Sequence, residues 1–355
     1  MSKSLIFSDL HLHSHKNRTN RLQDCLKVLN WVFDQAKEHQ CENIIFLGDL
    51  FHERSKIDVL NYLRTFECFM KYMLDDPPYD IWLLIGNHDM YHRERWDVNT
   101  IKPLTAIPKI HVIDKPCTLE IGGRSIDFLP HVEEPLGYLE EFENSQSELL
   151  FAHIAVHGAE LNSIYGTKSD VIVEHDGEMK PVSIDCFDKW KMTILGHYHG
   201  AQNLNEKVEY LGSPLQLSFG EAFQEKHVLI LNLNNLNKEY IVNNFSPQHF
   251  IISPDNLDSY DLNNNFVRIV VDNIGSDEII DLKRTINKDY NVASFDFKQK
   301  DKKSSENKIM LEEAKTILMK EDEMLENYVN AAKVPDSLDK DKLLTIGKEI
   351  CQKQN

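Results

Sequence analysis

The sequence lacks long apolar runs, closely spaced cysteines and an apolar leader. None of its apolar stretches approaches the roughly 18–20 residues that a membrane-spanning helix requires. Its six cysteines stand far apart, at positions 25, 41, 68, 117, 186 and 351, without the C-x-x-C spacing of zinc fingers and redox motifs. The N-terminus turns polar after three apolar residues, so a secretory signal is not expected. We therefore expect reduced thiols and a cytoplasmic protein.

Positive charge is also scarce. The 355 residues include 39 Lys and Arg against 57 Asp and Glu, which gives a formal net charge of −18. This balance argues against a protein whose whole surface coats nucleic acid, although it leaves room for a local basic groove. The apolar content of 41% suffices for one large core and one or two small ones. Histidine, by contrast, is plentiful, with 16 residues.

Up to about residue 240, short apolar runs alternate with helical patterns. Runs rich in Ile, Val, Leu and Phe predict strands: SLIFSDL, NIIFLGDL, IWLLIGN, IHVI, SIDFLPH, ELLFAH, MTILGHYH and HVLILNL. Helices are predicted at 20–40 and 58–74, where apolar residues recur at helical spacing. The order of strand, helix and strand implies parallel pairing, with helices over the sheet.

Beyond residue 245 the composition changes. Residues 243–265 are rich in Asn, Pro and Ser and predict a linker or an irregular lead into a new unit. FVRIVVD, a helical stretch near 277–288 and YNVASFDF then predict a small α+β domain. Two further helical patterns, at about 308–331 and 338–352, are separated by the helix-breaking Pro335.

Five of the predicted strands end in residue types that bind metal ions. These residues are Asp9 and His11, then Asp49 and His52, then Asn87, His88 and Asp89, then His153 and His157, and finally His197 and His199. Residues i and i+2 of an extended chain project to one side, so the first and last pairs can each aim two ligands at one point. Any single group is explained as well by a turn or a hydrogen-bonded core histidine. Five groups at strand ends, where α/β folds gather binding sites, together predict a metal centre.

The ordered motifs D-x-H, GD, GNHD, H and GH-x-H resemble those of the calcineurin-like metallophosphoesterase superfamily over about residues 5–200. The resemblance implies an α/β fold with a two-layer β-sandwich flanked by helices, and a dinuclear metal site. It implies that one metal ion is bound by Asp9, His11, Asp49 and His199, and the other by Asp49, Asn87, His153 and His197. Such mixed imidazole, carboxylate and amide ligands favour two Mn²⁺ ions, with Mg²⁺ or Fe²⁺ as alternatives.

Two residues beside the ligands have predicted catalytic roles. His88 adjoins a ligand without being one in the family pattern, and a histidine can carry a proton to a leaving oxygen near neutral pH. Asp89 is then predicted to orient His88.

Residues 210–233 narrow the resemblance to the SbcD family, the nuclease subunits of double-strand-break repair complexes, called the meiotic-recombination-eleven type in eukaryotes. The residues that match this family's pattern are Tyr210, Gly212, Ser213, Pro214, Phe219, Gly220 and Glu221. In that family, the histidine equivalent to His52 touches the substrate phosphate. The resemblance implies a Mn²⁺-dependent DNA exonuclease and endonuclease for repair and recombination. The compact size resembles bacteriophage recombination nucleases, which implies the cytoplasm of a host cell.

The family layout assigns the rest of the chain. It implies a nuclease domain at 1–245, a capping domain that helps hold DNA at 246–299, and a linker at 300–307. The helical segment at 308–355 would bind the coiled-coil base of an SbcC-type ATPase. The family also implies a homodimer formed through helices of the nuclease domain. The helix at 58–74 has more apolar residues than one sheet-facing stripe needs: Leu60, Leu63, Phe66, Phe69, Met70 and Met73.

Basic residues in the loops after the first three motifs are predicted to bind the DNA backbone. They are Lys16, Arg18, Arg21, Arg54, Arg93 and Arg95. Two departures from the family pattern lie outside the ligand set: His13 replaces a frequent Gly, and Met90-Tyr91 replaces a frequent Ser-Pro.

Two other functions stay open. One is a stand-alone phosphatase or phosphodiesterase that acts on a small molecule or a phosphoprotein, which has little use for the capping and C-terminal segments. The other is a scaffold with a decayed site, which a full set of seven ligands argues against.

Overall fold

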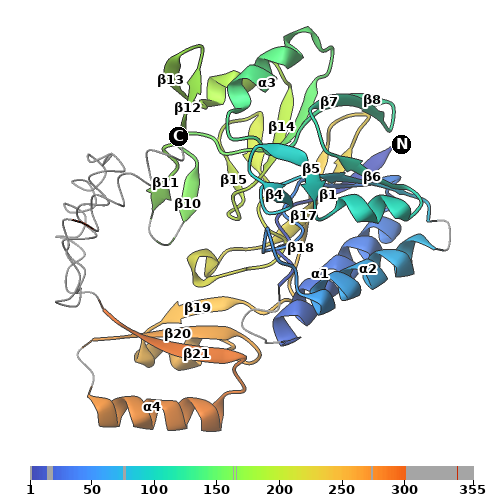
Figure 1. Cartoon of the computed structure of the whole chain (residues 1–355). Helices are drawn as coiled ribbons and strands as arrows, with labels where there is room; N and C mark the ends of the chain where they lie inside the picture. Colours follow the sequence, from blue (N-terminus) through green and yellow to red (C-terminus); the bar gives the residue numbers. More distant parts are fainter. Residues whose placement is uncertain are drawn as a thin grey trace. The chain divides into compact units, whose positions relative to one another are not determined.

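Two six-stranded β-sheets and the helices outside them dominate the fold (Figure 1). The structure is a computed structural model that describes residues 2–13, 19–74, 77–162, 164, 166–272, 275–300 and 342. Residues 1–298 form one compact unit. The helices predicted at 308–331 and 338–352, and nearly all of the predicted linker, lie outside the described residues. No described helix is both long and apolar enough to cross a membrane.

The first sheet has the order β18-β17-β1-β2-β3-β6. Its strands are β18 (Lys238–Val242), β17 (His227–Asn232), β1 (Lys3–Phe7), β2 (Asn43–Phe46), β3 (Asp80–Leu84) and β6 (Ile110–Ile113). The last four strands run parallel, and β17 pairs antiparallel with β1. Helices α1 (Thr19–Glu38) and α2 (Val59–Met73) are the connections that parallel pairing requires, as predicted at 20–40 and 58–74.

The second sheet has the order β15-β16-β14-β9-β8-β7. Its strands are β15 (Gln202–Asn203), β16 (Val208–Tyr210), β14 (Met192–Gly196), β9 (Leu149–His153), β8 (Arg124–Leu129) and β7 (Cys117–Ile121). The middle four strands are parallel, and each edge strand is antiparallel. Helix α3 (Pro135–Glu141) packs on this sheet.

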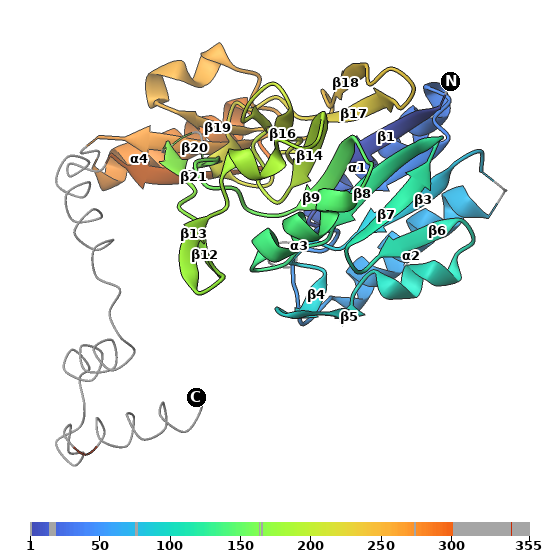
Figure 2. The same cartoon turned by 90° about the horizontal axis from the view of Figure 1, so that it is seen from above.

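Alternating side chains in the strands build the layers. Leu5 and Phe7 of β1 point to the layer of α1 and α2, whereas Ile6 points to the second sheet. Phe128 and Phe151 of the second sheet complete the buried layer between the sheets. A strand that is covered on both faces has a continuous run of apolar residues in its sequence. This explains why these strands could be predicted from the sequence. The predicted two-layer sandwich flanked by helices is confirmed, and Figure 2 shows it from a second direction.

Three hairpins and a small sheet lie outside the two large sheets in the described part of the chain, which also contains short 3-10 helices. The hairpins pair β4 (Met90–His92) with β5 (Arg95–Asn99), β10 (Glu160–Asn162) with β11 (Thr167–Lys168), and β12 (Ile172–His175) with β13 (Glu178–Pro181). The small sheet joins β19 (His249–Ile252), β20 (Phe266–Val271) and β21 (Ser294–Gln299), with α4 (Ser276–Asp289).

Of the two interpretations of residues 243–265, a linker or an irregular lead into a new unit, the linker is wrong. Strand β19 lies within that segment and pairs in parallel with β20, so that His249 stands opposite Phe266. The apolar run FII supplies Phe250 and Ile252 to the small core around Val267. Three apolar residues between polar neighbours are too short a run to be distinguished from a loop by periodicity alone.

Candidate metal centre

The five strands that end in metal-binding residue types bring most of these residues to one place. His157 is the exception, because it is exposed on a turn and lies in none of the groups of possible metal ligands among the described residues. Strands β1, β2 and β3 are parallel neighbours, with Phe7 opposite Phe46 and Phe46 opposite Leu83. In the second sheet, Gly196 of β14 stands opposite His153 of β9. Because the strands of each set end side by side, the residues that follow them gather at one end of the sandwich.

The loops that carry the ligand candidates adopt unusual backbone conformations. Asp9, His11 and Asp49 have φ angles of 52°, 46° and 63°, and that of His197 is 106°. Such values are costly for residues other than glycine and persist only where surrounding contacts hold them. The amide of Asp9 donates to the carbonyl of Gly48, and that of His11 donates to the carbonyl of Asp49, both at 3.0 Å. The loops after β1 and β2 therefore brace each other.

Gly86 permits the close approach of the third loop. A Cβ atom built at this position would lie 2.2 Å from Oδ1 of Asp49 and 2.4 Å from its amide nitrogen. No side chain fits at that distance. The glycine of the GNHD motif is thus required by the contact between the loops after β2 and β3.

The donor atoms form two adjoining groups. Asp9, His11 and His199 make one group and Asp49, His153 and His197 the other, with the atoms of each group within 4.8 Å of one another. These two groups match the division of ligands that the family resemblance implies. Oδ2 of Asp49 lies 3.5 Å from Nε2 of His11 and 3.4 Å from Nε2 of His153, so it stands between the groups.

Asn87 joins the second group. Its side-chain oxygen lies 3.1 Å from Nε2 of His153 and 3.0 Å from Nδ1 of His197. In the first group, Nε2 of His199 lies 3.0 Å from Nε2 of His11. Two imidazole nitrogens cannot face each other at this distance as bare lone pairs, so the arrangement requires a proton or a cation between them.

The charges also fit bound cations. Asp9 and Asp49 are 0% and 2% exposed, and burial of two carboxylates costs free energy unless positive charge compensates it. Burial lowers the pKa of His153, but the Asp49 carboxylate outweighs this and raises that pKa to about 9. Burial, together with the His153 charge, lowers the pKa of His197 to about 3, which keeps it neutral as a metal ligand must be. These residues therefore suit a divalent metal.

Hydrogen bonds on the far side of the imidazoles orient the ligand atoms. Nδ1 of His153 donates to the carbonyl of Leu47 at 2.6 Å, which turns its Nε2 toward Asp49. Nδ1 of His199 donates to Glu221 at 3.2 Å, which turns its Nε2 toward His11. Partners of this kind set the tautomer and direction of metal-binding histidines.

The predicted role of Asp89 is corrected. Its buried carboxylate accepts the backbone amides of Asp49 at 2.8 Å and of Leu50 and Gly86 at 3.0 Å. Burial and the Asp49 charge raise the pKa of Asp89 to about 7. The imidazole of His88 is instead held by the carbonyl of His52, to which its Nδ1 donates. Asp89 thus organises the loops around Asp49, and a backbone carbonyl orients His88.

His88 and His52 lie beside the ligands. The ring of His88 is 4.8 Å from that of His11, and the rings of His52 and His88 are stacked with their centroids 5.7 Å apart. One nitrogen from each of these three histidines also falls within a 4.8 Å group. His88 is partly exposed and His52 exposed, so both can meet a substrate.

The predicted DNA-binding residues divide into several cases. The prediction that Arg21 binds DNA is wrong. Its side chain is 4% exposed, donates to the carbonyl of Gln216, and belongs to the protein interior. Arg54 is half-buried and donates through Nε to the carbonyl of Asn87 at 2.6 Å, so it supports a ligand candidate. Arg93 and Arg95 are exposed on the β4–β5 hairpin, so their role in DNA binding stays a prediction. Lys16 and Arg18 lie outside the described residues.

One histidine at the centre, His131, was not predicted from the sequence. His131 follows β8, and its ring stacks on that of His197 with the centroids 5.9 Å apart. Within the described part of the chain, its buried Nδ1 has no hydrogen-bond partner. The signal was present, because SIDFLPH is another apolar run that ends in histidine.

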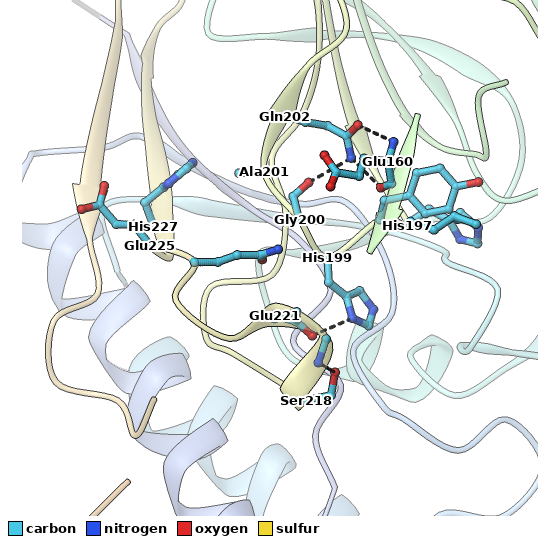
Figure 3. A pocket seen from close by; sticks show the side chains of 14 residues that line it. Glu160, His197, His199, Gly200, Ala201, Gln202, Ser218, Glu221, Glu225 and His227 are labelled. Carbon is cyan, nitrogen blue, oxygen red and sulfur yellow. Dashed lines mark hydrogen bonds and ion pairs between the residues drawn. The ribbon is translucent and has the colours of Figure 1, made fainter. Parts of the chain in front are cut away.

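A cavity of about 520 Å³ opens beside the candidate centre, with His197 and His199 on one wall (Figure 3). The β10 strand and the turn that contains Ser218 and Glu221 also line the cavity. The centre is therefore reached from the surface.

The chain is similar to several known proteins. Exonuclease subunit 1 of Enterobacteria phage T4 is 25% identical over 326 residues, which cover 88% of this chain and 86% of the relative. A crystal structure of the Pseudomonas putida nuclease MPE shares 14% identity with a TM-score of 0.29, over 67% of this chain and 87% of that one. A protein of unknown function from Aquifex aeolicus shares 15% identity with a TM-score of 0.26, over 54% and 94%.

Residues 2–204 match the calcineurin-like phosphoesterase family in sequence, and this range contains all seven ligand candidates. That range begins before β1 and extends past the β14 loop that carries His197 and His199. The chain therefore belongs to the calcineurin-like phosphoesterase family, and it is a metal-dependent phosphoesterase.

Proposed function

We propose that this phosphoesterase is a DNA nuclease, with exonuclease and endonuclease activity, and the nuclease subunit of an SbcCD-type repair and recombination complex. The observation that carries the proposal is the similarity to a phage exonuclease subunit over 88% of the chain. That similarity covers more of the chain than residues 2–204, the range that the phosphoesterase family matches. The small sheet β19-β20-β21 would have no evident function in a stand-alone phosphatase.

The proposed centre holds two Mn²⁺ ions, with Mg²⁺ or Fe²⁺ as alternatives. Asp9, His11 and His199 would hold the first ion, Asn87, His153 and His197 would hold the second, and Asp49 would serve both. When bound, a pair of divalent ions supplies Lewis-acid activation of water and neutralises the phosphate charge. The position of Asp49 Oδ2 between His11 and His153 supports the bridging role.

His88 is the proposed general acid. Because its Nδ1 is tied to the carbonyl of His52, only Nε2 can exchange a proton with a substrate. A protonated Nε2 delivers its proton to the oxygen that leaves when the phosphodiester is cleaved. His52, stacked beside it and exposed, is proposed to touch the substrate phosphate.

The proposed DNA contacts lie on the β4–β5 hairpin, which follows the GNHD loop directly. Arg93 and Arg95 are exposed there, with Arg95 paired to Asp97 at 2.6 Å. An exposed ion pair contributes little, so a phosphate can displace Asp97 at small cost. Two bound divalent ions add about four positive charges at the rim, which offsets the acidic chain locally.

Helix α2 supports the proposed homodimer. Val59 and Leu63 are 81% and 47% exposed on it. With Ile57, Tyr62 and Phe66 they line an apolar groove. Of the six apolar residues counted on this helix, Phe69 and Met73 face the core. The apolar surface that remains exposed suits a second copy of the chain across a two-fold axis.

The experiment that tests the nuclease proposal compares substrates on one preparation. The full chain is stripped with a chelator and reloaded with Mn²⁺. It is then assayed on single-stranded DNA, double-stranded DNA, a phosphomonoester and a phosphopeptide. We expect DNA cleavage that depends on Mn²⁺ and is lost in the Asp49→Ala variant. Hydrolysis of the phosphomonoester or the phosphopeptide with DNA left intact would overturn the proposal in favour of a phosphatase.

A second experiment tests the proposed partner, an SbcC-type ATPase bound through residues 308–355. The chain truncated after residue 307 is expected to stay folded, to cleave DNA with Mn²⁺, and to lose co-purification with the ATPase. Unfolding of the truncated chain would instead make this segment structural and contradict the partner proposal.

A further inference from the structure

A buried ion pair lies directly behind the ligand candidate His199. Glu221 and Lys226 have side chains only 7% and 4% exposed, and Nζ of Lys226 lies 2.7 Å from Oε2 of Glu221. The other carboxylate oxygen of Glu221 accepts the Nδ1 proton of His199 at 3.2 Å, as Figure 3 shows. The carboxylate thus joins the lysine on one side and the imidazole on the other.

Lys226 also holds the backbone of His199. Its Nζ donates to the carbonyl of His199 at 2.8 Å and to Oγ of Ser213 at 3.0 Å. The amide of Ser213 donates to the same carbonyl at 3.1 Å. His199 is therefore held at two points, at its carbonyl by Lys226 directly and at its ring through Glu221.

Gly212 allows the chain to come this close. Its φ angle is +75°, and a Cβ at this position would lie 2.7 Å from the carbonyl oxygen of His199. The segment after β16 is thus shaped to press against the backbone of His199, and it delivers Ser213 to the same carbonyl.

Stability alone is a poor explanation for this ion pair. Removal of two charges from water costs about as much as their attraction returns, and apolar pairs of similar volume are often as stable. A buried ion pair whose second carboxylate oxygen accepts a hydrogen bond from a histidine ring has a further role. It fixes the imidazole tautomer and direction and raises the basicity of the opposite nitrogen.

We propose that Glu221 and Lys226 are positioning residues of the metal centre, which hold His199 with Nδ1 protonated and Nε2 directed at the first ion. The inference rests on the proposed role of His199 as a ligand. Neither residue touches the reacting atoms, so both act through His199. Loss of such an outer partner lowers metal affinity by about 10- to 100-fold.

The test measures Mn²⁺ binding to the full chain without DNA, by electron paramagnetic resonance of free Mn²⁺, beside thermal stability. The variants are Glu221→Gln, Lys226→Met, the double variant that combines them, and His199→Ala as the reference for a lost ligand. Glu209→Gln with Lys238→Met is the matched control, because that pair also lies 2.7 Å apart but joins β16 to β18.

Glu221→Gln is expected to weaken one Mn²⁺ site by about 10- to 100-fold. Lys226→Met leaves Glu221 buried without its partner, so it is expected to lose thermal stability as well. The double variant regains stability because no charge is left unpaired, yet its Mn²⁺ affinity stays low. The matched control binds Mn²⁺ as the parent does.

Two results would overturn the inference. In the first, the Glu221→Gln variant binds Mn²⁺ as tightly as the parent, whereas His199→Ala binds it more weakly. His199 would then still be a ligand, but Glu221 would not position it. The other is a double variant that regains affinity together with stability, which makes the pair structural only. If His199→Ala also binds Mn²⁺ normally, both the assignment of His199 as a ligand and the inference are wrong. A chain that binds Mn²⁺ in this pattern but does not cleave DNA contradicts only the nuclease proposal.

Discussion

Replacement of His88 by alanine should separate catalysis from metal binding. The imidazole lies at a partly exposed position and donates to the carbonyl of His52, so its loss costs on the order of 1 kcal/mol of the free energy of unfolding. The backbone amide of residue 88, which donates to Oδ1 of Asp49 at 2.7 Å, remains in the variant. All seven ligand candidates remain as well. We therefore expect a folded chain with its full complement of metal.

The rate of DNA cleavage should nevertheless fall by about 10²–10⁴-fold, the usual contribution of a general acid. This corresponds to about 3–5 kcal/mol of transition-state stabilisation. The deoxyribose oxygen that leaves is strongly basic and needs a proton. A p-nitrophenolate leaves without one, so hydrolysis of bis(p-nitrophenyl) phosphate should change by no more than about tenfold. The difference between the two substrates identifies the acid.

The assay measures metal content by elemental analysis and both rates on the same preparation. His92→Ala is the matched control, because His92 is exposed on β4 only four residues away. Loss of metal together with activity would make His88 a ligand, as its place in the group with His11 and His52 allows. Equal loss on both substrates with metal retained would refute the acid role and point to substrate binding.

Three further predictions concern the centre, the hairpin and helix α2. Asp49→Ala should abolish binding of a metal pair, because its Oδ2 stands between both groups of ligands, and elemental analysis that still finds two ions would exclude bridging. Replacing Arg93 and Arg95 by alanine should weaken DNA binding and reduce its salt slope by about 0.9 per lost duplex phosphate contact, with hydrolysis of a small phosphodiester unchanged. An unaltered slope would make them ordinary surface charges. Leu63→Glu places a charge in the exposed apolar stripe of α2 and should convert a dimer to monomers in sedimentation at micromolar concentration. A parent that sediments only as a monomer would contradict the dimer.

The sequence by itself predicted the elements whose pattern is local. Parallel strands buried on both faces read as unbroken apolar runs, and α1 and α2 repeat apolar residues at helical spacing. The order of the metal-binding types along those strands carried the resemblance to the metallophosphoesterase superfamily, and that resemblance implied how the ligands divide between two ions. In the structure, Asp9, His11 and His199 lie together, as do Asp49, His153 and His197. Short or mostly exposed strands such as β19 and the β4–β5 hairpin have no such pattern, so they were missed.

Only the tertiary structure decided what each of these side chains contacts. Arg21 and Arg93 look alike in a basic loop, yet Arg21 is buried against Gln216, nearly two hundred residues away in the chain. Asp89 stands next to His88 in sequence but bonds the amides of the neighbouring loop, because the turn points successive side chains in different directions. Glu221 stood out in the sequence only as part of the family pattern, and nothing in the sequence indicated that it pairs with Lys226. The burial of a side chain and its bonding partners depend on which distant segments pack together. The spacing of residues along one strand does not predict that packing.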